Sequence, residues 1–120
     1  TMVFTLKSVA HIAEPRLRIR LILQNSTATP IAMTQTDPFE VAAGETFTRR
    51  VRFPLDSVAP GEYVLKISLV ANKPGGISTY YDTIVDVSRF VVVDDPAVNA
   101  GFVWRESLWG EIRLKPLEMA

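Results

Sequence analysis

Residues 16–23, Arg-Leu-Arg-Ile-Arg-Leu-Ile-Leu, alternate charged and aliphatic side chains along most of their length. Successive side chains of a β-strand point to opposite faces, so the pattern predicts a strand with one buried and one wet face. Similar alternation recurs in residues 47–53, 62–69 and 111–115. Arg49 is an exception, because it falls on the apolar face of its segment. The run 84–93 is rich in β-branched residues, which also favour strands.

Turn-forming residues separate these segments. They are Asn25-Ser26, Asp37-Pro38, Ala43-Gly44, Pro60-Gly61 and Pro74-Gly75-Gly76. No segment of helical length repeats its apolar residues every 3.6 positions. Seven to nine short strands with regular turns are typical of an immunoglobulin-like antiparallel β-sandwich. We therefore expect one all-β domain over residues 1–120, with a barrel as the structural alternative.

The composition excludes several classes of function. The chain has no cysteine, which removes disulfides, thiol nucleophiles and thiolate metal sites. Its 13 basic and 13 acidic residues give zero net charge, so bulk charge does not steer it to nucleic acid or to a membrane. No apolar run approaches the ~20 residues that a membrane span needs.

Catalytic motifs are missing as well. The sequence holds no G-x-x-x-x-G-K-[ST] phosphate loop and no G-x-S-x-G elbow, and its single histidine, His11, has no second ligand at metal spacing. Asp82 and Asp86 share one side of a predicted strand, and Asp94-Asp95 falls in a turn where calcium would lack alternating acidic ligands. Solvated carboxylates explain these positions better than catalysis does. We expect no enzyme, no metal and no cofactor, and an enzyme using Asp82 and Asp86 is the weakest hypothesis.

Arginine is the first candidate for binding. Arg16, Arg18 and Arg20 share one face of a predicted strand, and Arg50 and Arg52 share one face of another. If the two strands are neighbours, five guanidinium groups cluster on one wet sheet face. Such groups bind phosphate and carboxylate through two parallel hydrogen bonds. A solvated face balanced by acidic neighbours is the alternative.

Aromatic residues are the second candidate. Tyr80 and Tyr81 are consecutive, so one ring should point inward and the other outward, where it can stack on a sugar. Trp104 and Trp109 lie near the end of the chain. Two tryptophans are costly to leave in water, so we expect them in the core, over a sheet edge or against a second copy of the chain.

Several motifs together resemble a known family. They are Pro54-Leu55, then Pro60-Gly61-Glu62-Tyr63-Val64-Leu65-Lys66-Ile67-Ser68-Leu69, a loop at 71–79, Tyr81-Asp82, and Phe90-Val91-Val92-Val93. This order is similar to the C-terminal, polysaccharide-recognising domain of Wzt-type ATP-binding proteins of O-antigen ABC transporters. The resemblance covers most of the chain and is clearest over residues 47–109.

The resemblance implies a setting and partners. The domain would be the C-terminal part of a longer ABC transporter ATP-binding protein at the cytoplasmic face of the inner membrane. An upstream nucleotide-binding domain and the transporter's membrane subunit would be its partners. It would bind a lipid-linked O-antigen or related polysaccharide, often through its modified non-reducing end, before export. Family members dimerise, sometimes by exchanging a terminal strand, which makes Trp104 and Trp109 candidates for the dimer contact.

The resemblance transfers no ligand residue by motif, so the candidates come from surface reasoning. The expected glycan-binding residues are Arg18, Arg20, Arg50, Arg52, Tyr80 and Tyr81. The alternative function is a non-catalytic immunoglobulin-like dimerisation or spacer domain without a ligand.

Overall fold

The computed structural model describes residues 2–76, 78–93 and 103–119, with the backbone alone for residues 83–88. This part of the chain forms seven strands and one short helix. They are β1 (Met2–Val9), β2 (Glu14–Asn25), β3 (Pro30–Gln35), β4 (Phe39–Val41), β5 (Thr46–Phe53), β6 (Gly61–Asn72), β7 (Ser78–Val92) and α1 (Glu106–Trp109). The predicted antiparallel β-sandwich is confirmed.

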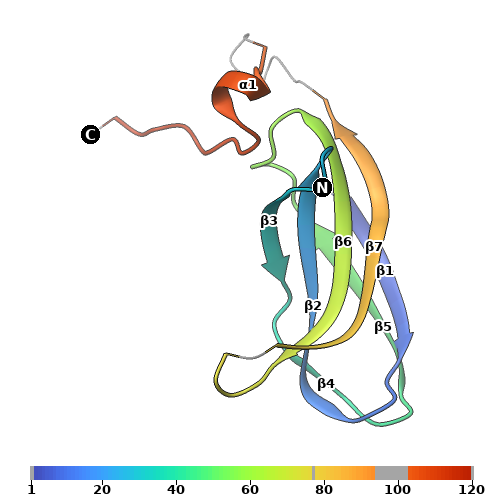
Figure 1. The fold of residues 1–120 in the computed structure, drawn as a ribbon. Coiled ribbons are helices and arrows are strands. Elements are labelled where there is room, and N and C mark those ends of the chain that lie inside the picture. Colours follow the sequence, from blue (N-terminus) through green and yellow to red (C-terminus); the bar gives the residue numbers. More distant parts are fainter. Residues whose placement is uncertain (1, 77, 94–102, 120) are drawn as a thin grey trace.

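The strands form two sheets. The larger sheet has the order β3-β2-β6-β7, and β4 also pairs with β2. The smaller sheet is the antiparallel pair β1-β5, which Figure 1 shows behind β2, β6 and β7. Both sheets contribute side chains to one apolar core. Each sheet therefore has an inner face that packs against the core and an outer face that is open to solvent.

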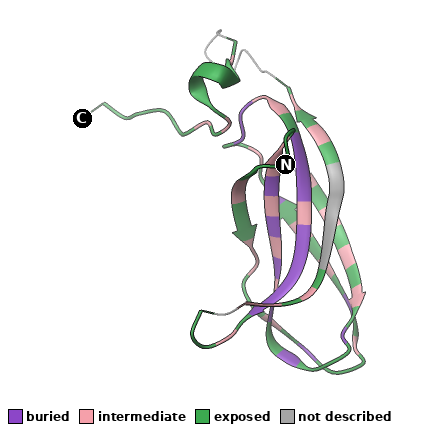
Figure 2. Cartoon of the chain, in the orientation of Figure 1, coloured by how far each residue is buried: buried purple, intermediate pink, exposed green. Residues whose placement is uncertain are grey.

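The inner face of β2 supplies the centre of this core. Its four aliphatic residues, Leu17, Ile19, Leu21 and Leu23, are only 1–3% exposed, as the alternation predicts. Figure 2 shows the buried positions gathered on β2 and β6. Phe47 and Phe53 meet them from β5 in the other sheet. Burying each such side chain stabilises the fold by about 1.5–3 kcal/mol.

Strand β6 is buried on both faces. Leu65, Ile67 and Leu69 face the core, whereas the register places Val70 on the outer face opposite Arg18 of β2 and Tyr80 of β7. Val70 is nevertheless fully buried. Its two long neighbours explain this, because arginine and tyrosine lay apolar stems over a sheet while keeping their polar ends in water. The outer face of β6 is therefore roofed by side chains of β2 and β7.

Arg49 lies on the apolar face of β5, where its guanidinium group contacts two aromatic rings. Its guanidinium carbon is 4.5 Å from the centre of the Phe39 ring and 5.7 Å from that of Phe47. The face of an aromatic ring attracts a cation, so this contact offsets part of the cost of half-burying the charge.

The predicted strand at 111–115 is wrong. Within the described chain, only an isolated bridge between Val58 and Ile112 forms there. Ala59 donates a backbone hydrogen bond to Glu111 (2.9 Å), and Arg113 donates one to Ser57 (2.8 Å). The segment opposite, 54–60, is too short and irregular to offer a continuous strand edge, so alternation alone does not produce a strand.

Substitutions at neighbouring positions of β2 test the two faces. Leu21→Ala should lower the free energy of unfolding by about 2–5 kcal/mol, because it opens a cavity in the core. Ile22→Ala, on the half-buried outer face, should cost less than about 2 kcal/mol. Urea unfolding measures both, and equal losses would contradict the assignment of the faces.

Candidate functional site

The five arginines predicted to cluster do not gather on one face. Strand β2 belongs to the larger sheet and β5 to the smaller one, so the two strands are not neighbours. Arg18 and Arg20 lie on the outer face of the larger sheet. Arg50 and Arg52 are exposed on the smaller sheet, where they line a groove of about 590 Å³ between β5 and β3. The predicted arginines therefore form two separate groups.

Arg20 is the centre of a polar cluster. Its Nη1 donates a hydrogen bond to the Tyr80 hydroxyl (3.0 Å), and its Nε and Nη2 both donate to Gln35 Oε1 (3.2 and 3.1 Å). Nη2 also donates to Asn72 Oδ1 (3.3 Å), which accepts a second bond from Ser78 Oγ (3.0 Å). We call these five residues the Arg20 cluster. All four partners are neutral, so the guanidinium charge is not balanced within the cluster.

The Arg20 cluster joins three strands, β3, β2 and β7, with the end of β6. Tyr80 is 55% exposed, and its ring centre lies 5.8 Å from the Arg20 guanidinium carbon. Arg18 extends the cluster along β2, where its Nη1 donates to the backbone oxygen of Thr36 (2.9 Å). The result is an aromatic ring beside fixed hydrogen-bonding groups on an open sheet face, which is a chemistry suited to sugars.

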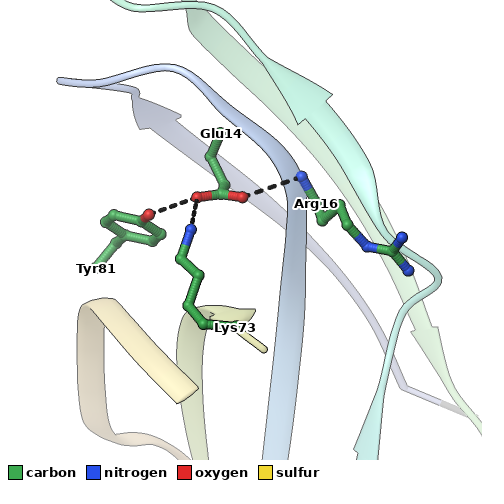
Figure 3. A network of polar contacts seen from close by, with 4 residues as sticks. All are labelled: Glu14, Arg16, Lys73 and Tyr81. Atoms are coloured by element: carbon green, nitrogen blue, oxygen red, sulfur yellow. Dashed lines mark hydrogen bonds and ion pairs between the residues drawn. The ribbon is translucent and has the colours of Figure 1, made fainter. Parts of the chain in front are cut away.

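Tyr81 points the other way. The register between β6 and β7 shifts between Leu69 and Val70, and Tyr81 is the extra residue of this bulge. Its hydroxyl donates to Glu14 Oε2 (2.6 Å), in the network drawn in Figure 3. The expectation that one tyrosine is outward and the other inward is confirmed. Tyr80 is the outward one.

Glu14 accepts three hydrogen bonds although it is only 4% exposed. Besides Tyr81, Lys73 Nζ reaches the same oxygen (2.6 Å), and the backbone N–H of Arg16 donates to Oε1 (3.2 Å). The Lys73 bond, helped by the Tyr81 bond, lowers the pKa of Glu14 against the opposing effect of burial. The bond to this carboxylate also raises the pKa of Lys73 and, together with burial, that of Tyr81.

Sequence reasoning missed Glu14, Lys73, Gln35 and Asn72. Each is an ordinary polar residue at a strand end or in a turn, and their separations along the chain carry no recognisable spacing. The pairing of β2 with β3 and β6 is what brings them to Arg20 or to one another. The alternation that exposes Arg18 and Arg20 and the consecutive pair Tyr80-Tyr81 were the signals for this part of the fold.

The other predicted candidates do not join this face. His11 and Asp82 line a cavity of about 140 Å³ between the two sheets, next to Glu14. The side chain of Asp86 and the Asp94-Asp95 turn lie outside the described residues. Over the described ranges, no group of three metal-ligating side chains occurs.

The two tryptophans pack on each other near α1. Their rings meet edge to face at 5.7 Å, and Trp104 Nε1 donates to the backbone oxygen of Gly110 (2.8 Å). Trp109 stays partly exposed. Beyond Arg113 the chain leaves the body of the domain, as Figure 1 shows, and its apolar side chains Leu117 and Met119 are 98% and 100% exposed.

The fold and this face define an immunoglobulin-like sandwich domain with a polar, aromatic outer sheet face. The family model of the Wzt C-terminal domain matches residues 1–105, and the chain belongs to this family. A solved structure described as the C-terminal domain of Wzt shares the fold, with a TM-score of 0.73 at 18% identity. The match covers 98% of this chain and 68% of that one. No curated protein matches the chain.

None of the helices in the described ranges has the length and apolar character to cross a membrane.

Acid should destabilise the domain through Glu14. Its folded-state pKa is below the ordinary value of 4.5, so the ionised carboxylate stabilises the fold above pH 4.5, and this contribution is lost as the pH falls through the folded pKa. Glu14→Gln should cost about 1–2 kcal/mol at pH 7, since Lys73 is partly solvated. Urea unfolding from pH 3 to 7 should show the two proteins converging below pH 4.5. A constant difference across this range would contradict the role of the charge.

Proposed function

We propose that the outer face of the larger sheet binds a polysaccharide, and that the domain recognises a lipid-linked O-antigen or related cell-surface polysaccharide for export by an ABC transporter. Membership in the Wzt C-terminal domain family supports the transporter setting. The observation that supports this face as the binding site is the Arg20 cluster. It places the exposed Tyr80 ring beside a guanidinium group whose partners in the cluster are all neutral.

The cluster supplies both interactions that a sugar needs. The Tyr80 ring offers a flat apolar surface to the C–H face of a pyranose, and Gln35, Asn72 and Ser78 offer donors and acceptors to its hydroxyl groups. Arg20 is already held by its neighbours, so binding orders few side chains and costs little conformational entropy. Because no acidic side chain balances Arg20 within the cluster, the site favours glycans with phosphate or carboxylate substituents, such as a modified non-reducing end.

Arg50 and Arg52 lie outside the proposed binding face. They belong to the smaller sheet and line the β3–β5 groove, which Gln35 also borders. In this proposal the sugar held by Tyr80 does not extend into that groove, so the two arginines serve as an internal control for the binding face. Tyr81 contributes through Glu14 and not through the ligand.

Membership in the family also supports a wider setting. We propose that the domain is the C-terminal part of a longer ATP-binding protein at the cytoplasmic face of the inner membrane. There it works without catalysis or a cofactor, beside a nucleotide-binding domain and the transporter's membrane subunit.

Titration with the polysaccharide of the host cell surface tests the binding face. Arg20→Ala and Tyr80→Ala should each weaken binding about tenfold, since each removes a charge-assisted hydrogen bond or a stacking surface. The double variant Arg50→Ala with Arg52→Ala should bind within about twofold of the wild type. Calorimetry measures all of them. Loss of binding in the double variant alone would move the site to the β3–β5 groove, and no binding by the wild type above millimolar glycan would refute the function.

We also propose that the domain forms a dimer through its C-terminal tail. Three apolar side chains of the tail, Leu114, Leu117 and Met119, are exposed beyond the last backbone bond to the domain at Arg113. A tail of this kind is buried most readily against a second copy, by pairing with a free strand edge. The groove between β3 and β5 offers two such edges over an apolar floor that includes Ile19 and Val51. Trp104 and Trp109 lie near the base of the tail and would flank the contact.

Light scattering after size exclusion tests the dimer. The wild type should show twice the 13.4 kDa chain mass, whereas Leu114→Asp with Leu117→Asp should be monomeric, because charge cannot enter an apolar groove unpaired. Val3→Asp with Val9→Asp, at exposed positions of β1, is the matched control and should stay dimeric. A monomeric wild type would contradict the proposal.

A further inference from the structure

The hairpin of β6 and β7 is held from both sides of the larger sheet. On the outer side, Asn72 and Tyr80 both contact Arg20. The next residues along the chain, Lys73 just after β6 and Tyr81 on β7, both contact Glu14 on the other side of the sheet. Arg20 and Glu14 belong to the same strand, β2. Strand β2 therefore contacts both arms of the hairpin, through a cation on one face and a carboxylate on the other. We call the contacts of Arg20 with Asn72 and Tyr80 the outer clamp, and those of Glu14 with Lys73 and Tyr81 the inner clamp.

The inner clamp is shorter and less exposed than the outer one. Both of its bonds measure 2.6 Å and end on one carboxylate oxygen, whereas the outer bonds to Tyr80 and Asn72 measure 3.0 and 3.3 Å. Glu14 is nearly fully buried, and charged hydrogen bonds are strongest away from water. The outer bonds lie at an exposed surface, where water competes for the same atoms.

The turn of the hairpin does not hold the arms in place by itself. It contains Pro74, Gly75 and Gly76, and both glycines have positive φ angles, of 85° and 80°. A Cβ added at either glycine would meet no atom within 4 Å, so these two residues are open to solvent on that side. The backbone positions of Asn72 and Tyr80 depend on the β6–β7 ladder, in which they pair with Ser78 and Val70, and their side chains depend on the contacts made beside the turn.

We propose that Glu14 is a positioning residue for the Arg20 cluster. By holding Lys73 and Tyr81, its carboxylate sets where Asn72 and Tyr80 stand against Arg20. The importance of this role for glycan binding rests on the proposed function, but the geometric coupling between the two faces of β2 does not. The ionisable groups around Glu14 are Lys73 and Tyr81 in direct contact, with His11 and Asp82 lining the adjacent cavity.

Glu14→Gln is the most informative variant, because it keeps the size of the side chain and removes its negative charge. Three donors point at the two carboxylate oxygens of Glu14, and a glutamine offers one acceptor oxygen, so its NH₂ group must face a donor. Lys73→Met is a second variant at a partly exposed position, which keeps the alkyl chain and removes the ammonium group. Val58→Ala is the control for general destabilisation, because Val58 is buried just before the start of β6, at the end of that strand away from the β6–β7 turn.

NMR of the Arg20 guanidinium N–H groups measures the coupling without any ligand. In the wild type and in Val58→Ala, these N–H groups should exchange with solvent at the same rate. In Glu14→Gln and Lys73→Met they should exchange at least about fivefold faster, a change of the size expected when a network contact is lost. Unchanged Arg20 signals in both variants, despite a lower melting temperature, would overturn the proposal and leave Glu14 a purely structural residue.

A binding measurement separates this proposal from the proposed function. With the host polysaccharide, Glu14→Gln should weaken binding about threefold to tenfold, and Val58→Ala should not. If the Arg20 signals respond but the wild type binds no polysaccharide, the positioning role stands and the glycan function fails. If glycan binds and Glu14→Gln changes neither the signals nor the affinity, the positioning role fails and the function stands.

Discussion

The burial of one face of β2 is the constraint on which the rest of the structure depends. Its aliphatic residues are almost inaccessible to water and pack against both sheets. Because side chains alternate along a strand, the same burial forces Arg18 and Arg20 onto the opposite face. The inner face of β2 thus contributes to the core, and its outer face contributes to the candidate binding face. A shift of the register by a single residue would exchange them.

A second constraint acts at the end of this strand. Glu14 lies on the inner side, where burial of an isolated carboxylate is unfavourable. Hydrogen bonds from an ammonium group, a phenol and a backbone N–H stabilise its charge. These partners come from the β6–β7 hairpin as well as from β2 itself. Satisfying one buried charge therefore also orders the hairpin that carries Asn72 and Tyr80.

The two ends of the sandwich differ in how they meet solvent. Near the β6–β7 turn, polar groups are paired into a closed network. At the other end, residues 111 and 113 make backbone hydrogen bonds to Ala59 and Ser57, and in the described residues beyond them the apolar side chains are exposed. This asymmetry agrees with the two proposed tasks, ligand recognition on a sheet face and association through the tail.

Alternation in several segments, together with regularly spaced turns, predicted a sandwich, because a period of two leaves few choices for which side of a strand is buried. Alternation also indicated that Tyr80 and Tyr81 face opposite ways. It misled at 111–115, where no continuous neighbouring edge is available to pair with. A local pattern describes what a segment offers, and a strand also needs a partner.

The sequence by itself determined the all-β class, the lack of cysteine chemistry, the inner and outer residues of β2, and the outward position of an aromatic ring. Only the tertiary structure decided that β2 and β5 belong to different sheets, which separates Arg20 from Arg52. It also decided that Gln35, Asn72 and Tyr80 meet at Arg20, and that Glu14 lies between Lys73 and Tyr81. The physical reason is that strand order and register depend on the packing of the whole core, and residues far apart in the chain become neighbours only when that packing is complete.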